Sequence, residues 1–208
     1  VANSGRLQEL LRPEYTMYLA PAPSGSLRKT AYTLALVEID GVLVSADARL
    51  PNALLREAIE TGTVPEFAGY RSIAQEVTFG ESRLDLVLSG IQGQCYVEVK
   101  SVTLVESEVG LFPDAPTERG RKHVRSLGEV IRHGHRAAVV FVIQRPDVTS
   151  LSPNEASDPR FWETLKETMT HGLEVYAYRC TVTRSRIDLS DAVPVRILRR
   201  HTRMTLDV

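Results

Sequence analysis

Residues 83–102 read RLDLVLSGIQGQCYVEVKSV, two strand-like segments joined by a turn of glycine and polar residues. Successive side chains of a strand point to opposite faces of its sheet. The first segment therefore places Asp85 on one face and three leucines on the other, namely Leu84, Leu86 and Leu88. In the second segment, Glu98 and Lys100 share one face and two valines occupy the other. Charged side chains thus project from two neighbouring strands that are otherwise apolar.

Three charges on such strands require compensation, because a buried ion without a partner costs several kcal/mol. Two carboxylates, Asp85 and Glu98, offer the hard oxygen ligands that Mg²⁺ prefers, so we expect one or two Mg²⁺ or Mn²⁺ ions here. Lys100 can orient an attacking water or stabilise negative charge that develops on a phosphate. We therefore predict these three residues as a catalytic cluster. A structural salt bridge between strands is the alternative.

The rest of the chain predicts an α/β domain that follows a smaller β module. After about residue 70, strands and helices alternate. The expected strands are Glu76–Phe79, Arg83–Leu88, Cys95–Val102, Ala137–Ile143 and Leu173–Thr183, and the expected helices are Thr117–His133 and Pro159–Thr170. The run 137–143 has no polar residue, which is typical of a central strand of a mixed sheet.

The N-terminal third contains short β-type segments and one strong turn signal. The expected strands are Tyr15–Leu19, Ala31–Ile39 and Leu43–Ser45. Asp40-Gly41 between the last two predicts a hairpin. A helix capped by Asn52 follows and is stopped by Gly62 and Pro65. We place the β module with this connecting helix in residues 1–65 and the α/β domain in residues 66–208.

Composition favours a globular protein that contacts nucleic acid locally. The net charge is −1 and the pI is about 6.6, which argues against coating nucleic acid through overall positive charge. Two segments are nevertheless basic, residues 118–136 and the stretch with Arg196, Arg199, Arg200 and Arg203. Arg119 and Lys122 lie three residues apart near a predicted helix start, where backbone N–H groups favour phosphate. We predict a phosphate anchor there, although a solvated surface explains either basic segment alone.

Several further residues have two readings each. Glu76 is either a third metal ligand or a surface carboxylate. Asp114 either caps the next helix or takes part in catalysis, and Thr117 with Glu118 also reads as a helix start. His123 is a general base or a hydrogen-bonded histidine. Tyr96 shares the strand face of Glu98 and is more typical of packing than of a site.

Cellular location follows from what the sequence lacks. It contains no apolar run of about 18 residues and does not open on a positively charged start leading into an apolar signal segment, so we expect no membrane partner and a cytoplasmic protein. The two cysteines, Cys95 and Cys180, lie in apolar strands and are expected to be buried, reduced thiols. The oligomeric state is not predicted.

The spacing Asp-x12-Glu-x-Lys resembles the PD-(D/E)xK nuclease superfamily, with Ser82-Arg83-Leu84 in place of the usual proline before Asp85. Longer blocks make the resemblance specific: Glu76-Val77, residues 80–85 (GESRLD), residues 97–104 (VEVKSVTL) and residues 112–123 (FPDAPTERGRKH). The chain resembles the sugar fermentation stimulation protein A family over essentially its whole length. The resemblance implies an N-terminal OB-like β-barrel followed by a nuclease-like domain, and it implies that the first part of the barrel is missing from this sequence. It also implies non-specific DNA binding and a link to the regulation of sugar metabolism, notably maltose metabolism.

Three hypotheses about function follow. The first is a metal-dependent phosphodiesterase that acts on DNA. The second is a protein that binds DNA through a nuclease-like fold without cleaving it, because a fold does not dictate a function. The third is binding of RNA or single-stranded DNA by the β module, whose aromatic residues are Tyr15, Tyr18 and Tyr32.

Overall fold

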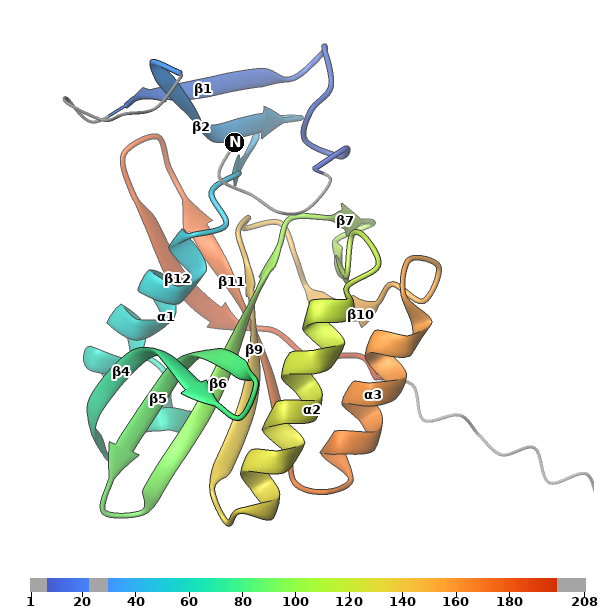
Figure 1. Cartoon of the computed structure of the whole chain (residues 1–208). Coiled ribbons are helices and arrows are strands. Elements are labelled where there is room, and N and C mark those ends of the chain that lie inside the picture. Colours follow the sequence, from blue (N-terminus) through green and yellow to red (C-terminus); the bar gives the residue numbers. More distant parts are fainter. Residues whose placement is uncertain (1–6, 23–29, 198–208) are drawn as a thin grey trace, which may run out of the picture.

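The N-terminal part of the chain forms a small antiparallel sheet in the computed structural model, which describes residues 7–22 and 30–197 (Figure 1). Its strands are β1 (Thr16–Pro21), β2 (Tyr32–Ile39) and β3 (Val42–Ser45), in the order β1-β2-β3. Ile39 pairs with Val42, and the two residues between them, Asp40 and Gly41, have φ of 51° and 81°. This is a two-residue hairpin turn, so the hairpin prediction is confirmed. Residues 3–5 and the arginines at 199, 200 and 203 lie outside the described residues.

The second part is built on a six-stranded mixed sheet with helices on both faces (Figure 1). Its strand order is β12 (Ile187–Ala192), β11 (Glu174–Val182), β9 (Arg136–Ile143), β6 (Gly93–Val102), β5 (Ser82–Gly90) and β4 (Tyr70–Phe79). The three strands β6, β9 and β11 are parallel, and the others pair antiparallel. The apolar run 137–143 lies at the centre of this sheet, as its composition predicts.

In the described part of the chain, three helices cover the sheet. Helix α1 (Leu50–Glu60) lies on one face, and α2 (Glu118–Arg132) and α3 (Pro159–Met169) lie on the other. The remaining elements are the 3-10 turn η1 (Pro65–Phe67) and a small sheet of β10 (Ser150–Pro153), β8 (Val109–Phe112) and β7 (Val105–Glu106). Helix α1, which was expected to belong to the N-terminal module, packs on the six-stranded sheet.

Side-chain caps begin both helices of the second face, and both helices start within one residue of their predicted starts. Thr117 Oγ1 accepts a hydrogen bond from Gly120 N at 3.0 Å at the start of α2. Asp158 Oδ1 accepts one from Phe161 N at 3.1 Å at the start of α3. Each bond satisfies a backbone donor that the helix itself leaves unpaired. Because Thr117 is the N-cap of α2, the capping role considered for Asp114 is wrong.

The start of α1 differs from the prediction. The helix begins at Leu50 with Arg49 as its N-cap, and Pro51 lies in its first turn, where the missing N–H of proline costs nothing. Asn52 therefore lies inside the helix and does not cap it. Its side chain is used in the functional site.

The packing of β5 also differs from strict strand alternation. Leu86 and Leu88 belong to the core between the sheet and α1, whereas Leu84 belongs to the core beneath α2 and α3. Pairing of β5 with β6 ends at Leu86, and beyond it an Asp85 carboxylate oxygen takes the N–H of Val99. The Asp85 side chain thus takes the place of a backbone carbonyl of β5, and β5 stops pairing with β6 at Asp85. The prediction that the three leucines share one face is wrong.

The two parts of the chain are joined by specific contacts. Ser45 N donates to Gln144 O at 3.0 Å, and Thr103 Oγ1 donates to Glu9 Oε1 at 2.8 Å. Arg184, in the turn between β11 and β12, donates to the hydroxyl of Tyr18 at 2.8 Å and lies 5.0 Å from the centre of its ring. The β11–β12 hairpin therefore reaches from the large sheet to the N-terminal one, as Figure 1 shows.

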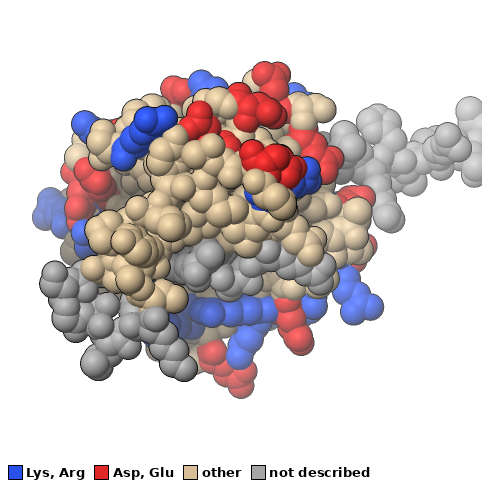
Figure 2. All heavy atoms as spheres, turned by 90° about the horizontal axis from the view of Figure 1, so that it is seen from above, with Lys and Arg blue, Asp and Glu red and all other residues tan. Residues whose placement is uncertain are grey.

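The surface over the N-terminal sheet carries no uniform charge. Figure 2 shows acidic and basic side chains interspersed around a largely uncharged area. Met17, Leu19 and Tyr32 are exposed in this sheet. No helix of the described residues is long and apolar enough to cross a membrane.

The cysteines are buried free thiols, as predicted. Burial raises the pKa of both Cys95 and Cys180 to about 12.

Candidate metal and nucleic-acid site

The structure brings Asp85, Glu98 and Lys100 together where β5 leaves β6. Lys100 Nζ donates to Glu98 Oε1 at 2.5 Å. Asp85 is fixed through both oxygens, since Oδ1 accepts from Asn52 Nδ2 at 2.9 Å and Oδ2 accepts from Val99 N at 2.8 Å. Asp85 is therefore positioned by Asn52 of α1 and by the backbone of β6, and Glu98 is positioned by Lys100.

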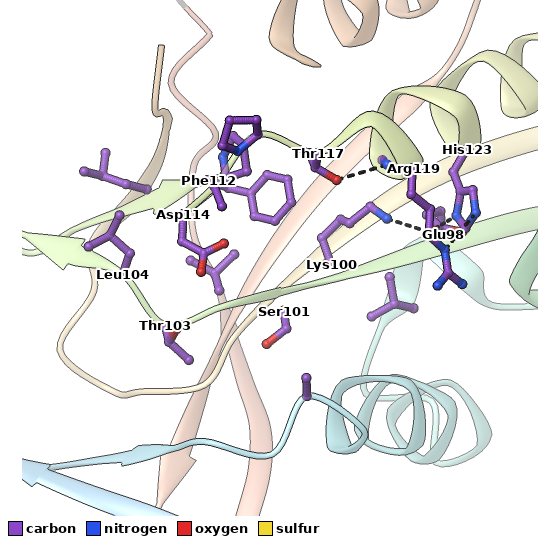
Figure 3. A pocket seen from close by; sticks show the side chains of 18 of the residues that line it. Glu98, Lys100, Ser101, Thr103, Leu104, Phe112, Asp114, Thr117, Arg119 and His123 are labelled. Atoms are coloured by element: carbon purple, nitrogen blue, oxygen red, sulfur yellow. Dashed lines mark hydrogen bonds and ion pairs between the residues drawn. The ribbon is translucent and has the colours of Figure 1, made fainter. Parts of the chain in front are cut away.

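A histidine from α2 completes the surroundings of Glu98. His123 Nδ1 contacts Glu98 Oε1, and Arg119 Nε lies 3.5 Å from His123 Nε2. If Nε2 accepts from Arg119, Nδ1 carries the proton and donates to Glu98. Figure 3 shows His123 and Lys100 converging on Glu98 from α2 and β6. His123 is thus a hydrogen-bonded histidine held against the acid.

The two acids have opposite pKa shifts. Burial, reinforced by the charge of Glu98, raises the pKa of Asp85, against hydrogen bonds from Val99 and Asn52. Burial also opposes ionisation of Glu98, but the Lys100 charge and the His123 hydrogen bond together lower its pKa. The two pKa values separate because Glu98 has a cationic partner and Asp85 is mainly desolvated.

One carboxylate oxygen of Glu98 lacks a hydrogen-bond donor. Glu98 is 2% exposed, and its second oxygen, Oε2, is buried without a hydrogen-bond partner among the described residues. A buried acceptor with no donor is destabilising by roughly 1–3 kcal/mol. An oxygen ligand beside a second carboxylate suits a hard divalent cation. The donor set of Asp85 and Glu98 therefore fits such an ion.

A cavity of about 340 Å³ opens beside these residues. Its floor is the end of β6, and one wall is the segment from Phe112 to Thr117, which leads from β8 into α2. Asn52, Asp85, Glu98, Lys100, Arg119 and His123 all line it. Figure 3 shows the Asp114 carboxylate pointing into the space between this wall and β6.

Other predicted site residues lie elsewhere. Lys122 is half-exposed and pairs with Glu81 at 3.2 Å, and it is not among the described residues that line the cavity. Glu76, on the edge strand β4, is exposed and lies 3.6 Å from Arg83. It also stands outside the cavity lining. Within residues 7–22 and 30–197, no group of three or more His, Cys, Asp or Glu side chains is arranged to hold a metal ion.

Sequence reasoning missed Asn52 as a site residue. Its contact with Asp85 spans 33 positions of the chain. The available signal was a polar residue, Asn52, near the start of a helix whose other inward side chains are apolar. A polar residue at that position is more typical of a helix cap than of a functional site.

Asp158 holds the start of α2 against α3 and thereby supports the cavity wall. Its Oδ2 accepts from Thr117 N at 2.8 Å and from Arg121 Nη1 at 2.5 Å, and the residue is 3% exposed. We predict that Asp158→Asn lowers the free energy of unfolding by about 1–3 kcal/mol, because buried donors lose their charged acceptor. Urea unfolding measures this. Asp191→Asn, in an exposed pair with Arg179, is the matched control and should cost less than about 1 kcal/mol. Equal losses in the two variants would contradict the prediction.

Comparisons with known proteins agree with this architecture. Residues 49–186 match the family model described as the sugar fermentation stimulation protein RE domain, and residues 1–46 match the SfsA N-terminal OB domain. The chain is 48% identical over 198 residues to a sugar fermentation stimulation protein homolog of Moorella thermoacetica, covering 95% of this chain and 85% of that one. It is 44% identical over 197 residues to a homolog of Desulforamulus reducens, covering 95% and 82%.

A solved structure shares the fold of most of the chain. It is described as the structure of Pyrococcus furiosus SfsA in complex with Ca²⁺. The TM-score is 0.87 at 34% sequence identity, with coverage of 95% of this chain and 84% of that chain. The chain belongs to the sugar fermentation stimulation protein family, SfsA, and combines its N-terminal OB domain with its nuclease-like second domain.

Proposed function

We propose that this protein binds DNA without sequence preference and hydrolyses its phosphodiester bonds with a divalent cation held by Asp85 and Glu98. The observation that carries the proposal is the buried, unpartnered Oε2 of Glu98 beside a second carboxylate. The Ca²⁺ complex of the Pyrococcus furiosus relative supports a cation in this fold, since Ca²⁺ and Mg²⁺ both prefer oxygen ligands. When bound, Mg²⁺ or Mn²⁺ would supply positive charge next to the scissile phosphate.

The side chains of the chain have separate tasks in this proposal. Asn52 and the Val99 N–H orient Asp85, so that its oxygens are held before substrate arrives. Lys100 donates to Glu98 and, at 14% side-chain exposure, can also face a phosphate in the cavity. Its ammonium then stabilises the negative charge that grows in the transition state. Arg119 is exposed at the cavity and anchors a neighbouring phosphate.

The experiment is a cleavage assay on end-labelled DNA with the purified chain. We expect products with Mg²⁺ or Mn²⁺ and none with EDTA. DNA binding is measured in parallel by fluorescence anisotropy, with Ca²⁺ added to both assays as a third condition. Binding that persists with no products under any condition would leave the protein as a DNA-binding protein and would refute hydrolysis.

DNA binding without cleavage is the second candidate function. In the described part of the chain, Asp85 and Glu98 have no third acidic or histidine ligand beside them. Two ligands hold a metal ion more weakly than three or four, and this favours binding without cleavage. The names of the relatives refer to sugar fermentation. DNA binding without hydrolysis would be enough for the regulatory role in sugar or maltose metabolism that the family resemblance implies.

DNA affinity should depend steeply on salt, because Lys and Arg that neutralise phosphates release counterions. We predict that Arg119→Ala and Lys122→Ala each reduce the slope of log affinity against log salt concentration by about 1. Anisotropy titrations between 50 and 200 mM salt measure this, roughly the range over which such contacts matter. Arg186→Ala, in the exposed β11–β12 turn, is the control and should leave the slope unchanged. Slopes equal to that of the unaltered protein would remove these residues from the phosphate anchor.

A further inference from the structure

The cavity beside Asp85 and Glu98 has two chemically different ends. At one end lie the carboxylates with Lys100 and Arg119, which suit a metal ion and a phosphate. Away from these residues, where Figure 3 shows Thr103, Leu104, Phe112 and Asp114, the lining is uncharged apart from that one acid. Lysine and arginine are absent from the described residues that line this second end. A continuous run of backbone phosphates would find no partners there.

The second end has the chemistry of a nucleoside site. Leu104 and Phe112 offer apolar surface, and Ser101 and Asp114 offer hydrogen-bonding groups. The Asp114 carboxylate points into the space, as Figure 3 shows, where it repels a phosphate but can accept from the amino group of a base. Pockets that recognise small molecules combine apolar walls with a few polar groups in this way.

The shape of the cavity limits what can enter it. Its lining follows the chain from Glu98 to Leu104, which at about 3.3 Å per residue is roughly 20 Å. A volume of about 340 Å³ over that length makes a narrow trough. Glu98 and Lys100 lie deep in it, since Glu98 is 2% exposed and the Lys100 side chain 14%. A duplex, whose grooves alone are roughly 6 and 12 Å wide, is too broad to bring an internal phosphate to that depth.

We infer that the trough binds the unpaired nucleoside next to the scissile phosphate, so that the substrate of this site is single-stranded nucleic acid. The inference rests on the proposed function, because it assigns the substrate class of the same site. Two lining residues, Leu7 and Ala48, come from the matched OB domain and from the link that follows it. OB folds are suited to single strands, which they hold in a groove. Phosphate is held at the metal end and the base at the Asp114 end.

Binding, measured without any cleavage, tests this inference. The full chain in Ca²⁺ is titrated into fluorescent single-stranded DNA, single-stranded RNA and blunt duplex DNA of one length. We expect single strands to bind at least roughly tenfold more tightly than duplex. The DNA and RNA arms show which sugar the trough accepts, and preference for either single strand supports the inference. Duplex that binds as well as both single strands overturns it.

A variant that obstructs the trough tests whether single strands bind there. Ala48→Trp adds a large side chain to the lining of the trough without altering Asp85, Glu98 or Lys100, and should weaken single-strand binding by roughly tenfold while leaving duplex binding unchanged. Ala156→Trp makes the same change on an exposed turn and is the control. Thermal melts establish that both variants fold. If Ala48→Trp folds and binds single strands as the control does, the trough is not their site and the inference fails.

The two proposals fail in different ways. Single-strand preference with no products in Mg²⁺ or Mn²⁺ supports the trough and refutes hydrolysis. Equal cleavage of single-stranded and duplex DNA supports hydrolysis and refutes the trough. No binding of any nucleic acid refutes both.

Discussion

Replacing Lys100 by Met is expected to reduce the rate of Mg²⁺-dependent DNA cleavage by about 10²–10³-fold, the usual effect of removing one preorganised charge donor from a site of this kind. The methionine keeps the length and apolar stem of lysine but lacks the ammonium that donates to Glu98. Single-turnover cleavage of labelled DNA measures the effect. DNA affinity should change far less, because Arg119 remains at the cavity.

The control variant tests whether losing a positive charge elsewhere in the protein has the same effect on cleavage. Lys166→Met removes a lysine of α3 whose ammonium lies 3.8 Å from the Glu155 carboxylate, and it should leave cleavage unchanged. A thermal melt of each variant is needed, because Glu98 loses a partner when Lys100 is replaced. If folded Lys100→Met protein cleaves at the unaltered rate, Lys100 has no part in the reaction and the cluster is structural.

The second large effect is on stability. Trp162→Ala should lower the free energy of unfolding by about 3–5 kcal/mol, the range for removing a large buried aromatic side chain. Trp162 is 0% exposed and stacks on Phe141 at 5.7 Å between ring centres, with 8° between the ring planes. Its Nε1–H donates to the Phe112 carbonyl at 2.5 Å. Urea unfolding followed by circular dichroism measures the loss.

Trp162→Phe divides this effect into its parts. Phenylalanine retains most of the packing and loses the hydrogen bond to Phe112, so the loss should be about 1–3 kcal/mol. Because Phe112 begins the cavity wall, this variant should also weaken nucleic-acid binding. A loss below about 1 kcal/mol for Trp162→Ala would mean that the core beneath α2 and α3 re-forms around the gap.

Local patterns in the sequence were sufficient to predict most of the helices and strands and part of the site. Alternation along a strand places Glu98 and Lys100 on one face, and the structure agrees. The helix predicted over 117–133 runs from Glu118 to Arg132 with Thr117 and His133 as its caps. Such features depend on neighbouring residues, whose spacing the sequence gives directly.

Long-range contacts were beyond the same reasoning. Asn52 reaches Asp85 only after α1 packs on the sheet, and His123 reaches Glu98 only after α2 packs on the opposite face. Leu84 was misplaced because a side-chain carboxylate takes over a strand hydrogen bond, an exchange that period-two alternation cannot represent. Strands β7, β8, β10 and β12 are not among the predicted ones, because short or partly polar edge segments carry weak patterns.

The contact between Arg184 and Tyr18 has a consequence for the order in which the protein is made. The two residues are 166 positions apart, and ribosomes add about 5–20 residues per second. Tyr18 is therefore synthesised roughly 8–30 s before its partner exists. During that interval the N-terminal part can form its own hairpin and, once Thr103 and Gln144 have been made, its contacts to those residues, but not the contact to Arg184. The Arg184 contact is consequently the last of these attachments to form, and a nascent chain stalled before residue 184 would carry an N-terminal sheet without it.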